Sequence, residues 1–337
     1  MTMENTMTQS AVPNRLSGNW RHYLLRWETF LLLVAALVFL FNSFASPYFL
    51  DPWNLSDATF NFTEKAIIAL PMAMLIICRE IDLSVASIIA LASVSMGLAA
   101  EAGMGTGSLV AIAIAVGVAC GLFNGLVVTG FGIPSIVVTI GTMSLYRGIT
   151  YVILGDGAFT DYPSEFAYFG QGYVYWVFSF EFVLFLGLAL VFYVLLHHTN
   201  FGRRTYAIGN NPTAALYSGI KVNKHKLILF VLVGALSGLA SVLLTSRLGS
   251  TRPSIAFAWE LNIVTMVVLG GVSILGGAGS ILGVVIAVFL MGLVTFGLGL
   301  LNVPGIVMSI IIGAMLISVI SIPVLLGRWR AMRERQS

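Results

Sequence analysis

Ten apolar stretches, separated by short polar or turn-rich segments, run along this chain. A helix needs about 20 mainly apolar residues to cross a bilayer, so each stretch is a candidate membrane span. The second, fifth and eighth are short or weakly apolar. The predicted spans cover residues 28–46, 64–79, 83–101, 108–130, 134–154, 172–196, 227–246, 261–275, 279–301 and 304–326. We therefore expect an all-α polytopic membrane protein with about ten transmembrane helices, some of them short or broken.

Composition supports the same class. Apolar residues make up 58% of the 337 residues and charged residues only 9%, whereas about a quarter of an ordinary soluble domain is charged. The net charge of +3 is scattered over loop ends, so it does not indicate a nucleic acid partner. Cys78 and Cys120 both lie in apolar segments, which indicates neither a disulfide framework nor a metal site.

The distribution of basic residues predicts the orientation, because cytosolic loops collect Lys and Arg. With the N-terminus inside, 13 of the 17 basic residues fall on the cytosolic side. These 13 are Arg15, Arg21, Arg26, Arg79, Arg203, Arg204, Lys221, Lys224, Lys226, Arg328, Arg330, Arg333 and Arg335. We therefore expect a cytosolic tail (1–27), a transmembrane domain (28–326) with a cytosolic loop (197–226), and a basic cytosolic tail (327–337).

The cytosolic loop carries the signals of a short helix. Asn211 suits the N-cap, Pro212 the first helical position and Gly219 a left-handed stop. Two helical turns held outside the bilayer on the basic side predict a docking element for a cytosolic partner. The residues expected to serve docking are Gly209, Asn210, Asn211, Pro212, Ala214, Ala215, Ser218 and Gly219.

Charged residues at or within the membrane are a second signal, because they are costly there. Arg79, Glu80 and Asp82 either form one self-neutralising unit at a helix break, or lie in a cytosolic turn where Asp82 or Ser84 caps the next span. Arg147 either extends outward to the interface or lines a polar path. Glu260 opens the eighth span, where it would complement the helix dipole. The candidate path residues are Asp82, Ser84, Asn124, Thr139, Thr142, Ser144, Arg147, Glu260 and Asn262.

Glycine spacing predicts close helix packing. Gly117, Gly121 and Gly125 share one face of a span, and small residues at this spacing let two backbones approach. The Gly-rich run 276–280 lacks the Lys-Ser/Thr ending of a phosphate-binding loop, so we expect no nucleotide site on this chain. Spans two and three share a rough plan with spans eight and nine, including Met-Gly-Leu at 96–98 and 291–293, which indicates an internal repeat.

No catalytic arrangement emerges. The four histidines fall at cytosolic span ends, and the pair His197-His198 is better explained by interface charge than by a metal. An enzyme is therefore not indicated.

Five motifs, spread over about residues 65–283, resemble the membrane-spanning permease of sugar-type ABC importers, the family that serves ribose, xylose, rhamnose and autoinducer-2. The matching residues are Ile81-Asp82-Leu83-Ser84-Val85; Gly121-Leu122-Phe123-Asn124-Gly125; Pro134-Ser135-Ile136-Val137-Val138-Thr139-Ile140-Gly141-Thr142-Met143; Tyr206-Ala207-Ile208-Gly209-Asn210-Asn211-Pro212 with Ala214-Ala215 and Ser218-Gly219-Ile220; and Val268-Leu269-Gly270-Gly271-Val272-Ser273 with Gly276-Gly277 and Gly279-Ser280. In that family, the segment resembling 206–220 docks on the ATPase.

Two departures from the family pattern bear on the substrate. Arg79-Glu80 stands where members often have Gly-Gly, and Asn262 stands where they usually have Asp. Arg79-Glu80 with Ala86 is most similar to the rhamnose branch, and the segment 216–218 is similar to both autoinducer-2 and rhamnose permeases.

The resemblance implies a permease subunit of the bacterial inner membrane, with rhamnose favoured as the solute and autoinducer-2 as an alternative. Its expected partners are a cytosolic ABC ATPase, a second permease copy or paralogue, a periplasmic sugar-binding protein and the lipid bilayer. ATP and Mg²⁺ would bind the ATPase, leaving this chain without a cofactor. An ion-coupled secondary transporter is the alternative class. It would bury titratable residues at mid-bilayer, whereas the acidic residues here fall mostly at predicted span ends.

Overall fold

The computed structural model describes residues 27–315, 317–318 and 321. Seven helices are long and apolar enough to cross a membrane: α2 (Trp27–Ala45), α3 (Pro52–Ile77), α5 (Thr106–Phe131), α6 (Ser135–Leu154), α8 (Phe180–His198), α11 (Val222–Leu248) and α13 (Ile281–Leu300). Three shorter apolar helices are α4 (Val85–Glu101), α12 (Trp259–Leu269) and Gly305–Met315. Each predicted span overlaps one of these ten helices, so the all-α membrane class is confirmed.

The remaining elements are short. They are the 3₁₀ helix η1 (Ser164–Ala167), α7 (Tyr168–Gln171), the strands β1 (Tyr173–Tyr175) and β2 (Phe178–Ser179), and the helices α9 (Asn200–Asn210) and α10 (Pro212–Tyr217). The two strands pair antiparallel as a hairpin, with Tyr173 opposite Ser179.

Two predicted span starts are far from the observed ones, both because a polar residue caps a helix. The second predicted span starts at Pro52 rather than 64, since Asp51 Oδ1 accepts hydrogen bonds from the backbone N–H groups of Trp53 (2.8 Å) and Asn54 (3.2 Å). Span six begins at Phe180 rather than 172, because Ser179 caps α8 and the hairpin takes up the preceding residues.

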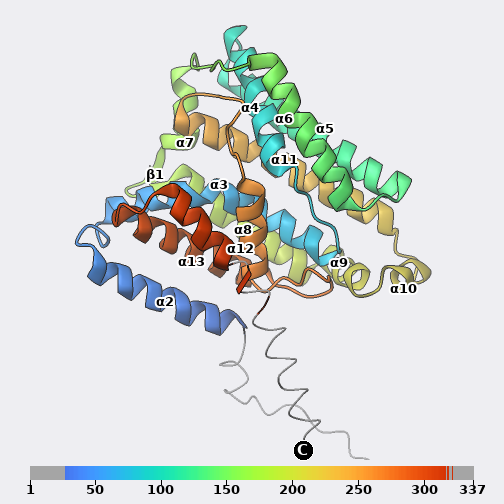
Figure 1. Cartoon of the computed structure of the whole chain (residues 1–337). Coiled ribbons are helices and arrows are strands. Elements are labelled where there is room, and N and C mark those ends of the chain that lie inside the picture. The colour runs from blue at the N-terminus through green and yellow to red at the C-terminus, as the bar shows by residue number, and fades with distance from the viewer. Residues whose placement is uncertain (1–26, 316, 319–320, 322–337) are drawn as a thin grey trace, which may run out of the picture.

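Helix α3 is the centre of the fold. Every residue from Ala66 to Ile77 is fully buried. Helix α13 packs against α2 and α3, and α3 also contacts α8, α11 and α12. Figure 1 shows α2 and α13 on one side of α3, with α4, α5, α6 and α11 forming a tilted group on the other.

The predicted glycine face on α5 is confirmed. A Cβ on Gly117 would lie 2.2 Å from the carbonyl oxygen of Gly234, and one on Gly121 would lie 2.4 Å from that of Phe230. Both partners belong to α11, and Gly125 faces the same helix. The backbones of α5 and α11 therefore touch at a separation that only glycine permits.

The predicted repeat corresponds to two broken helix pairs, α3–α4 and α12–α13. In both, the second helix has a serine at its N-cap, Ser84 and Ser280. In both, the glycine of the Met-Gly-Leu segment faces a phenylalanine ring: Gly97 faces Phe159 and Gly292 faces Phe62. The pairs share a plan, and a duplication remains a prediction.

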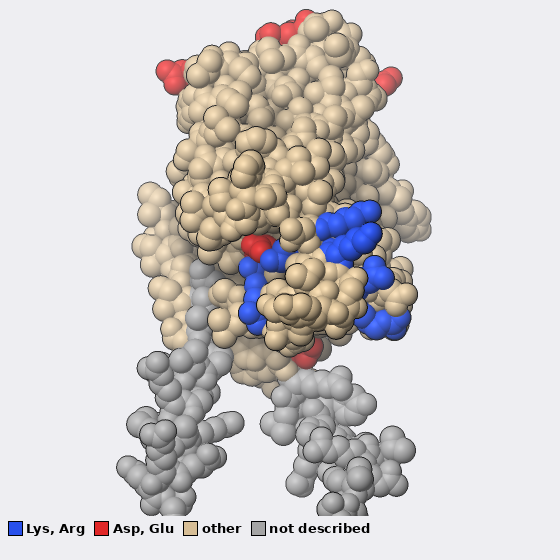
Figure 2. All heavy atoms as spheres, turned by 90° about the vertical axis from the view of Figure 1, so that its right-hand side faces the viewer, with Lys and Arg blue, Asp and Glu red and all other residues tan. Residues whose placement is uncertain are grey.

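Charge is distributed unevenly between the two ends of the molecule. On the face drawn in Figure 2, blue Lys and Arg side chains gather at the lower end, while most red acidic side chains stand at the upper end. Six basic residues lie in or next to α9, α10 and the start of α11: Arg79, Arg203, Arg204, Lys221, Lys224 and Lys226. The tails and the other seven basic residues predicted to be cytosolic lie outside the described residues.

Candidate functional site

The short helix α10 forms where its sequence predicts it. The Asn211 side chain accepts from the backbone N–H of Ala214 at 3.0 Å, and Pro212 follows at the first helical position. The Ser218 hydroxyl donates to the Ala214 carbonyl at 2.9 Å, and Gly219 adopts the expected left-handed conformation with φ 84°. The start and stop signals are therefore confirmed. Helix α9 directly before it was not predicted.

The predicted docking residues do not share one surface. Gly209 and Ala215 are buried, and Ala215 is only 4% exposed. Pro212 is half-buried. The exposed members are Asn210, Asn211, Ala214, Ser218 and Gly219. A bulky residue at position 215 would therefore disturb packing within this chain before it met a partner.

Two exposed residues of α10 escaped the sequence analysis. The side chain of Leu216 is 59% exposed and that of Tyr217 is 86% exposed. Lys221 and Lys224 line the hollows beside α10. The missed signal was an adjacent pair of large apolar side chains in a basic loop. We call Leu216, Tyr217, Lys221 and Lys224 the α10 surface; an apolar tip with basic residues around it suits an acidic protein partner.

Helix α9 carries α10 and is fixed to both helix breaks. Gly209 fits tightly, because a Cβ there would lie 1.9 Å from the carbonyl oxygen of Ile77 and 2.5 Å from the backbone nitrogen of Gly277. The Tyr206 hydroxyl donates to the Gly279 carbonyl at 2.7 Å. Burial raises the pKa of the Tyr206 phenol, which keeps this donor neutral. A shift of α9 must therefore act on the segments 78–84 and 270–280.

The predicted self-neutralising unit of Arg79, Glu80 and Asp82 is wrong. Arg79 donates to the carbonyls of Gly209 and Asn210. Glu80 forms an ion pair with Lys226 of α11. The alternative, in which Asp82 or Ser84 caps the next span, is right in part: Ser84 takes the N-cap position of α4, but no side-chain capping bond is formed. Asp82 Oδ1 accepts from the backbone N–H of Ser84 at 2.8 Å, just before the helix. The three charged side chains therefore have three different sets of partners.

Asp82 is the centre of a buried polar cluster. Its Oδ1 accepts from the Ser84 hydroxyl at 2.6 Å, and its Oδ2 accepts from Asn124 Nδ2 at 3.2 Å. The same Asn124 amide donates to Ser84 Oγ at 2.8 Å, and Asn124 Oδ1 accepts from the Tyr146 hydroxyl at 3.2 Å. Asp82, Ser84 and Asn124 are each fully buried. The cluster joins the α3–α4 break to α5 and α6, and Tyr146 is a member that the sequence analysis missed.

Only some of the other predicted path residues lie next to this cluster. Thr139 is buried and donates to the Ile81 carbonyl at 3.4 Å, next to Asp82, and Thr142 donates to the Thr139 carbonyl. Ser144 is exposed on α6. Glu260 lies in the first turn of α12, which agrees with the helix-dipole interpretation. Asn262, also in α12, is half-buried.

Arg147 joins elements rather than extending freely outward. Its guanidinium donates to the carbonyls of Pro253, Ile255 (2.8 Å) and Ala86 (3.1 Å). Arg147 therefore ties α6 to α4 and to the irregular segment before α12. The sequence analysis had Arg147 either extend outward to the interface or line a polar path. Neither interpretation included these bonds to backbone carbonyls.

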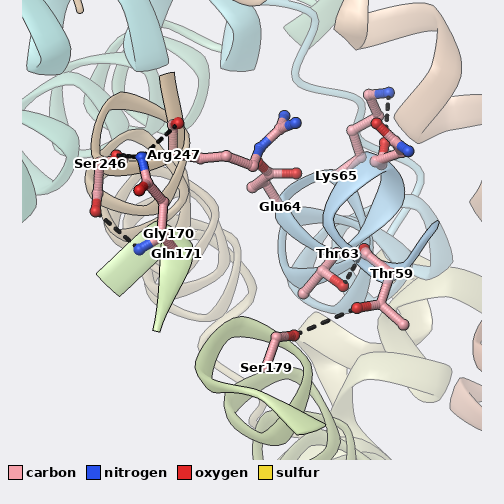
Figure 3. A network of polar contacts seen from close by, with 10 residues as sticks. Thr59, Thr63, Glu64, Lys65, Gly170, Gln171, Ser179, Ser246 and Arg247 are labelled. Atoms are coloured by element: carbon pink, nitrogen blue, oxygen red, sulfur yellow. Dashed lines mark hydrogen bonds and ion pairs between the residues drawn. The ribbon is translucent and has the colours of Figure 1, made fainter. Parts of the chain in front are cut away.

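A second buried charged cluster was missed. Glu64 of α3 is fully buried, and its Oε1 lies 2.7 Å from Nε of Arg247 at the end of α11. Figure 3 shows Arg247 extending from α11 toward Glu64. Glu181 of α8 is also buried, close enough to Glu64 and Arg247 to feel their charges, and among the described residues neither of its carboxyl oxygens has a hydrogen-bond partner. Helices α3, α8 and α11 therefore meet around two carboxyl groups and one guanidinium.

Within the described part of the chain, no three His, Cys, Asp or Glu side chains are grouped to hold a metal. The arrangement is that of a membrane transport component: apolar helices, buried polar clusters and an exposed basic surface at one end. Residues 54–320 match the family described as branched-chain amino acid transport system / permease component. The chain belongs to this family, so it is a multi-pass membrane permease component of a bacterial importer.

Similar proteins cover almost the full chain. It is 33% identical over 302 residues to the autoinducer 2 import system permease protein LsrD of Enterobacter sp. (strain 638), covering 88% of this chain and 92% of that protein. It is 36% identical over 288 residues to the ribose import permease protein RbsC of Bacillus subtilis (strain 168), covering 85% and 88%. It is 35% identical over 302 residues to LsrD of Escherichia coli (strain K12), covering 87% and 91%. No solved structure matches the chain.

Membership of this family shows which subunit hydrolyses ATP. A permease component is not itself catalytic and carries no cofactor, and ATP is hydrolysed by a separate subunit. The absence of a catalytic arrangement, inferred from the sequence, agrees with this assignment.

Proposed function

We propose that this chain is the membrane permease subunit of an ATP-driven importer for a monosaccharide or sugar-like solute. The observation that carries the proposal is the full-length similarity to LsrD and RbsC, whose names give autoinducer 2 and ribose as their solutes. The family description names branched-chain amino acids, so family membership alone does not decide the solute.

Rhamnose remains a prediction from Arg79-Glu80, Ala86 and the segment 216–218. None of the relatives described above is named for rhamnose. Autoinducer-2 and ribose therefore stand beside rhamnose as solutes to test.

An ATPase is proposed to dock on the α10 surface. Three features support this assignment: the helix is held outside the long apolar helices, its tip exposes Leu216 and Tyr217, and lysines surround it. An exposed aromatic side chain in a charged setting is a common anchor of protein interfaces. The other proposed partners are a second permease copy or paralogue and a periplasmic solute-binding protein.

The proposed location is the bacterial inner membrane with both termini cytosolic, supported by the basic residues around α9 and α10. The Asp82–Asn124 cluster is proposed to lie along the translocation path, together with the neighbouring Thr139 and Thr142. Its burial where α4, α5 and α6 meet supports that role.

Ion-coupled transport is the rival mechanism, and the structure removes one argument against it. Glu64, Asp82 and Glu181 are fully buried, whereas the sequence analysis placed the acidic groups mostly at span ends. Glu64 is paired with Arg247, and Asp82 is satisfied by Ser84 and Asn124. Among the described residues, however, both oxygens of Glu181 and one oxygen of Glu64 have no hydrogen-bond partner, so the buried carboxyl groups do not exclude ion coupling. Family membership is what favours ATP-driven import.

The test is solute uptake into proteoliposomes that contain this permease and the ATPase, with the binding protein outside. Radiolabelled ribose, rhamnose, xylose and autoinducer-2 are compared. We expect uptake of one of them to require ATP inside, to stop with a non-hydrolysable analogue and to survive ionophores that collapse ion gradients. Uptake that persists without ATP and stops with an ionophore would overturn the proposal.

A further inference from the structure

Arg79 occupies a backbone position that ordinarily belongs to glycine. Helix α3 ends with the Arg79 N–H donating to the Ile76 carbonyl (2.9 Å) and the Glu80 N–H donating to the Leu75 carbonyl (3.1 Å). These two bonds make a Schellman cap, whose first residue beyond the cap is left-handed and usually glycine. Arg79 has φ 65°. An arginine in this conformation is strained, so its side chain should supply something that glycine cannot.

The Arg79 side chain supplies a link to α9. Its Nε donates to the Gly209 carbonyl at 2.7 Å and its Nη2 donates to the Asn210 carbonyl at 2.8 Å. These are the last two residues of α9. Carbonyls at a helix C-terminus lack partners within the helix and carry the negative end of its dipole, so a guanidinium complements both their hydrogen bonding and their charge.

Backbone contacts close the same junction. The Gly277 N–H donates to the Ile77 carbonyl at 2.9 Å, so the α12–α13 break completes the cap of α3. A Cβ on Gly276 would lie 2.3 Å from Cγ of Arg79. The Arg79 stem therefore lies between the end of α9 and the glycine-rich turn.

Two acidic residues that follow Arg79 extend the connection. Glu80 pairs with Lys226 near the start of α11, and Asp82 bonds Asn124 of α5. Three side chains in a four-residue stretch thus hold α9, α11 and α5. A displacement of α9 reaches the buried Asp82 cluster through a segment of fixed geometry.

We propose that Arg79 is a positioning residue that transmits movement of the α9–α10 element to the α3–α4 break. The proposal rests on the proposed function, in which an ATPase docks on α10. It assigns to Arg79 the coupling of ATP hydrolysis to solute movement, and assigns ATPase binding to the α10 surface.

The first test uses the permease alone in lipid nanodiscs, so it does not depend on an ATPase. Arg79→Gly removes the side chain and relieves the left-handed backbone, which favours folding of the variant. Asn302→Gly is the matched control, because Asn302 also has positive φ (56°). Hydrogen exchange should become faster across residues 206–217 and 276–278 in Arg79→Gly only. Unchanged exchange in these segments would overturn the proposal whether or not an ATPase binds.

The second test uses the permease–ATPase complex. In Arg79→Gly we expect ATPase affinity within the error of wild type and solute imported per ATP reduced about tenfold, the size of a typical coupling free energy. Arg79→Lys retains the charge and should recover part of the loss. Loss of ATPase binding in Arg79→Gly would overturn the positioning role by making Arg79 a contact residue, and wild-type import per ATP would overturn it outright. If the wild-type permease binds no ATPase, the proposed function fails. The link from Arg79 to α9 is then tested by the exchange experiment alone.

Discussion

Nε of Arg247 lies 2.7 Å from Oε1 of Glu64, joining the end of α11 to the middle of α3. Glu64 is fully buried, whereas the Arg247 side chain is 23% exposed. The pair therefore responds unequally to loss of either partner. Arg247→Gln strands a buried carboxylate, while Glu64→Gln leaves a guanidinium that can still turn toward water.

This asymmetry predicts the order of stabilities. Breaking a buried pair costs about 3–5 kcal/mol when one charge is left uncompensated. We expect Arg247→Gln to lower the thermal unfolding midpoint more than Glu64→Gln does. The double variant should lose much less than the sum of the two single losses. The midpoints are measured by intrinsic fluorescence in nanodiscs. Additive losses would show that the two side chains do not interact.

The α5–α11 contact predicts opposite effects for two glycines of one helix. In Gly117→Ala, the new methyl group would lie 2.2 Å from the Gly234 carbonyl oxygen, so the helices must separate. We expect a loss of about 1–3 kcal/mol, as for other overpacked cores. A Cβ on Gly130 meets no atom of the described residues within 4 Å. Gly130 lies in the last turn of α5, so Gly130→Ala should gain at most about 0.5–1 kcal/mol from helix propensity. Equal shifts of the two unfolding midpoints would contradict the close packing.

The Asp82 cluster predicts that Asn124→Leu is costly. Leucine has a similar size but removes the amide that serves Asp82, Ser84 and Tyr146, and an unsatisfied buried partner costs about 1–3 kcal/mol. We expect lower stability and reduced solute uptake in proteoliposomes. Ser108→Ala is the control, since Ser108 is exposed near the start of α5 and is not a candidate path residue. Uptake at the wild-type rate in a folded Asn124→Leu protein would remove the cluster from the translocation path.

Single cysteines test the orientation. The native Cys78 and Cys120 are buried, so a membrane-impermeant maleimide should label an introduced surface cysteine selectively. We expect Ser218→Cys to react only in inside-out vesicles and Asp161→Cys only in right-side-out cells. The reverse pattern would invert the predicted topology.

The sequence predicted what is local and missed what is distant. The Asn211 cap, the Gly219 stop and the glycine face of α5 follow from spacing within one helix, and all three are confirmed. The partners of Arg79 and Glu80 lie 130 and 146 positions away, and Arg247 lies 183 from Glu64. Such pairs leave no local pattern, so neither of the two interpretations drawn from the sequence included the actual partner of Arg79.

The spacing of residues in the sequence also did not show which side chains of α10 are exposed. Ala215 was predicted to contact a partner because its side chain is small. The structure shows instead that this small side chain packs inside the chain. Tyr217 looked unremarkable next to it and carries the most exposed large side chain of the helix. Which face of a six-residue helix is free depends on how α9 is fixed, and the contacts of Gly209 with Ile77 and Gly277 set that.

ATPase binding by the α10 surface is the central claim, and one affinity comparison tests it most directly. Tyr217→Asp places a negative charge at the centre of the surface, whereas Tyr175→Asp alters a tyrosine of similar exposure (75% against 86%) in the β1–β2 hairpin. The equilibrium affinity of each nanodisc-embedded variant for the purified ATPase is measured by biolayer interferometry. We expect Tyr217→Asp to weaken binding at least about thirtyfold, a loss of about 2 kcal/mol that defines an interface hot spot, and Tyr175→Asp to bind as wild type. Equal affinity of the two variants would contradict the assignment.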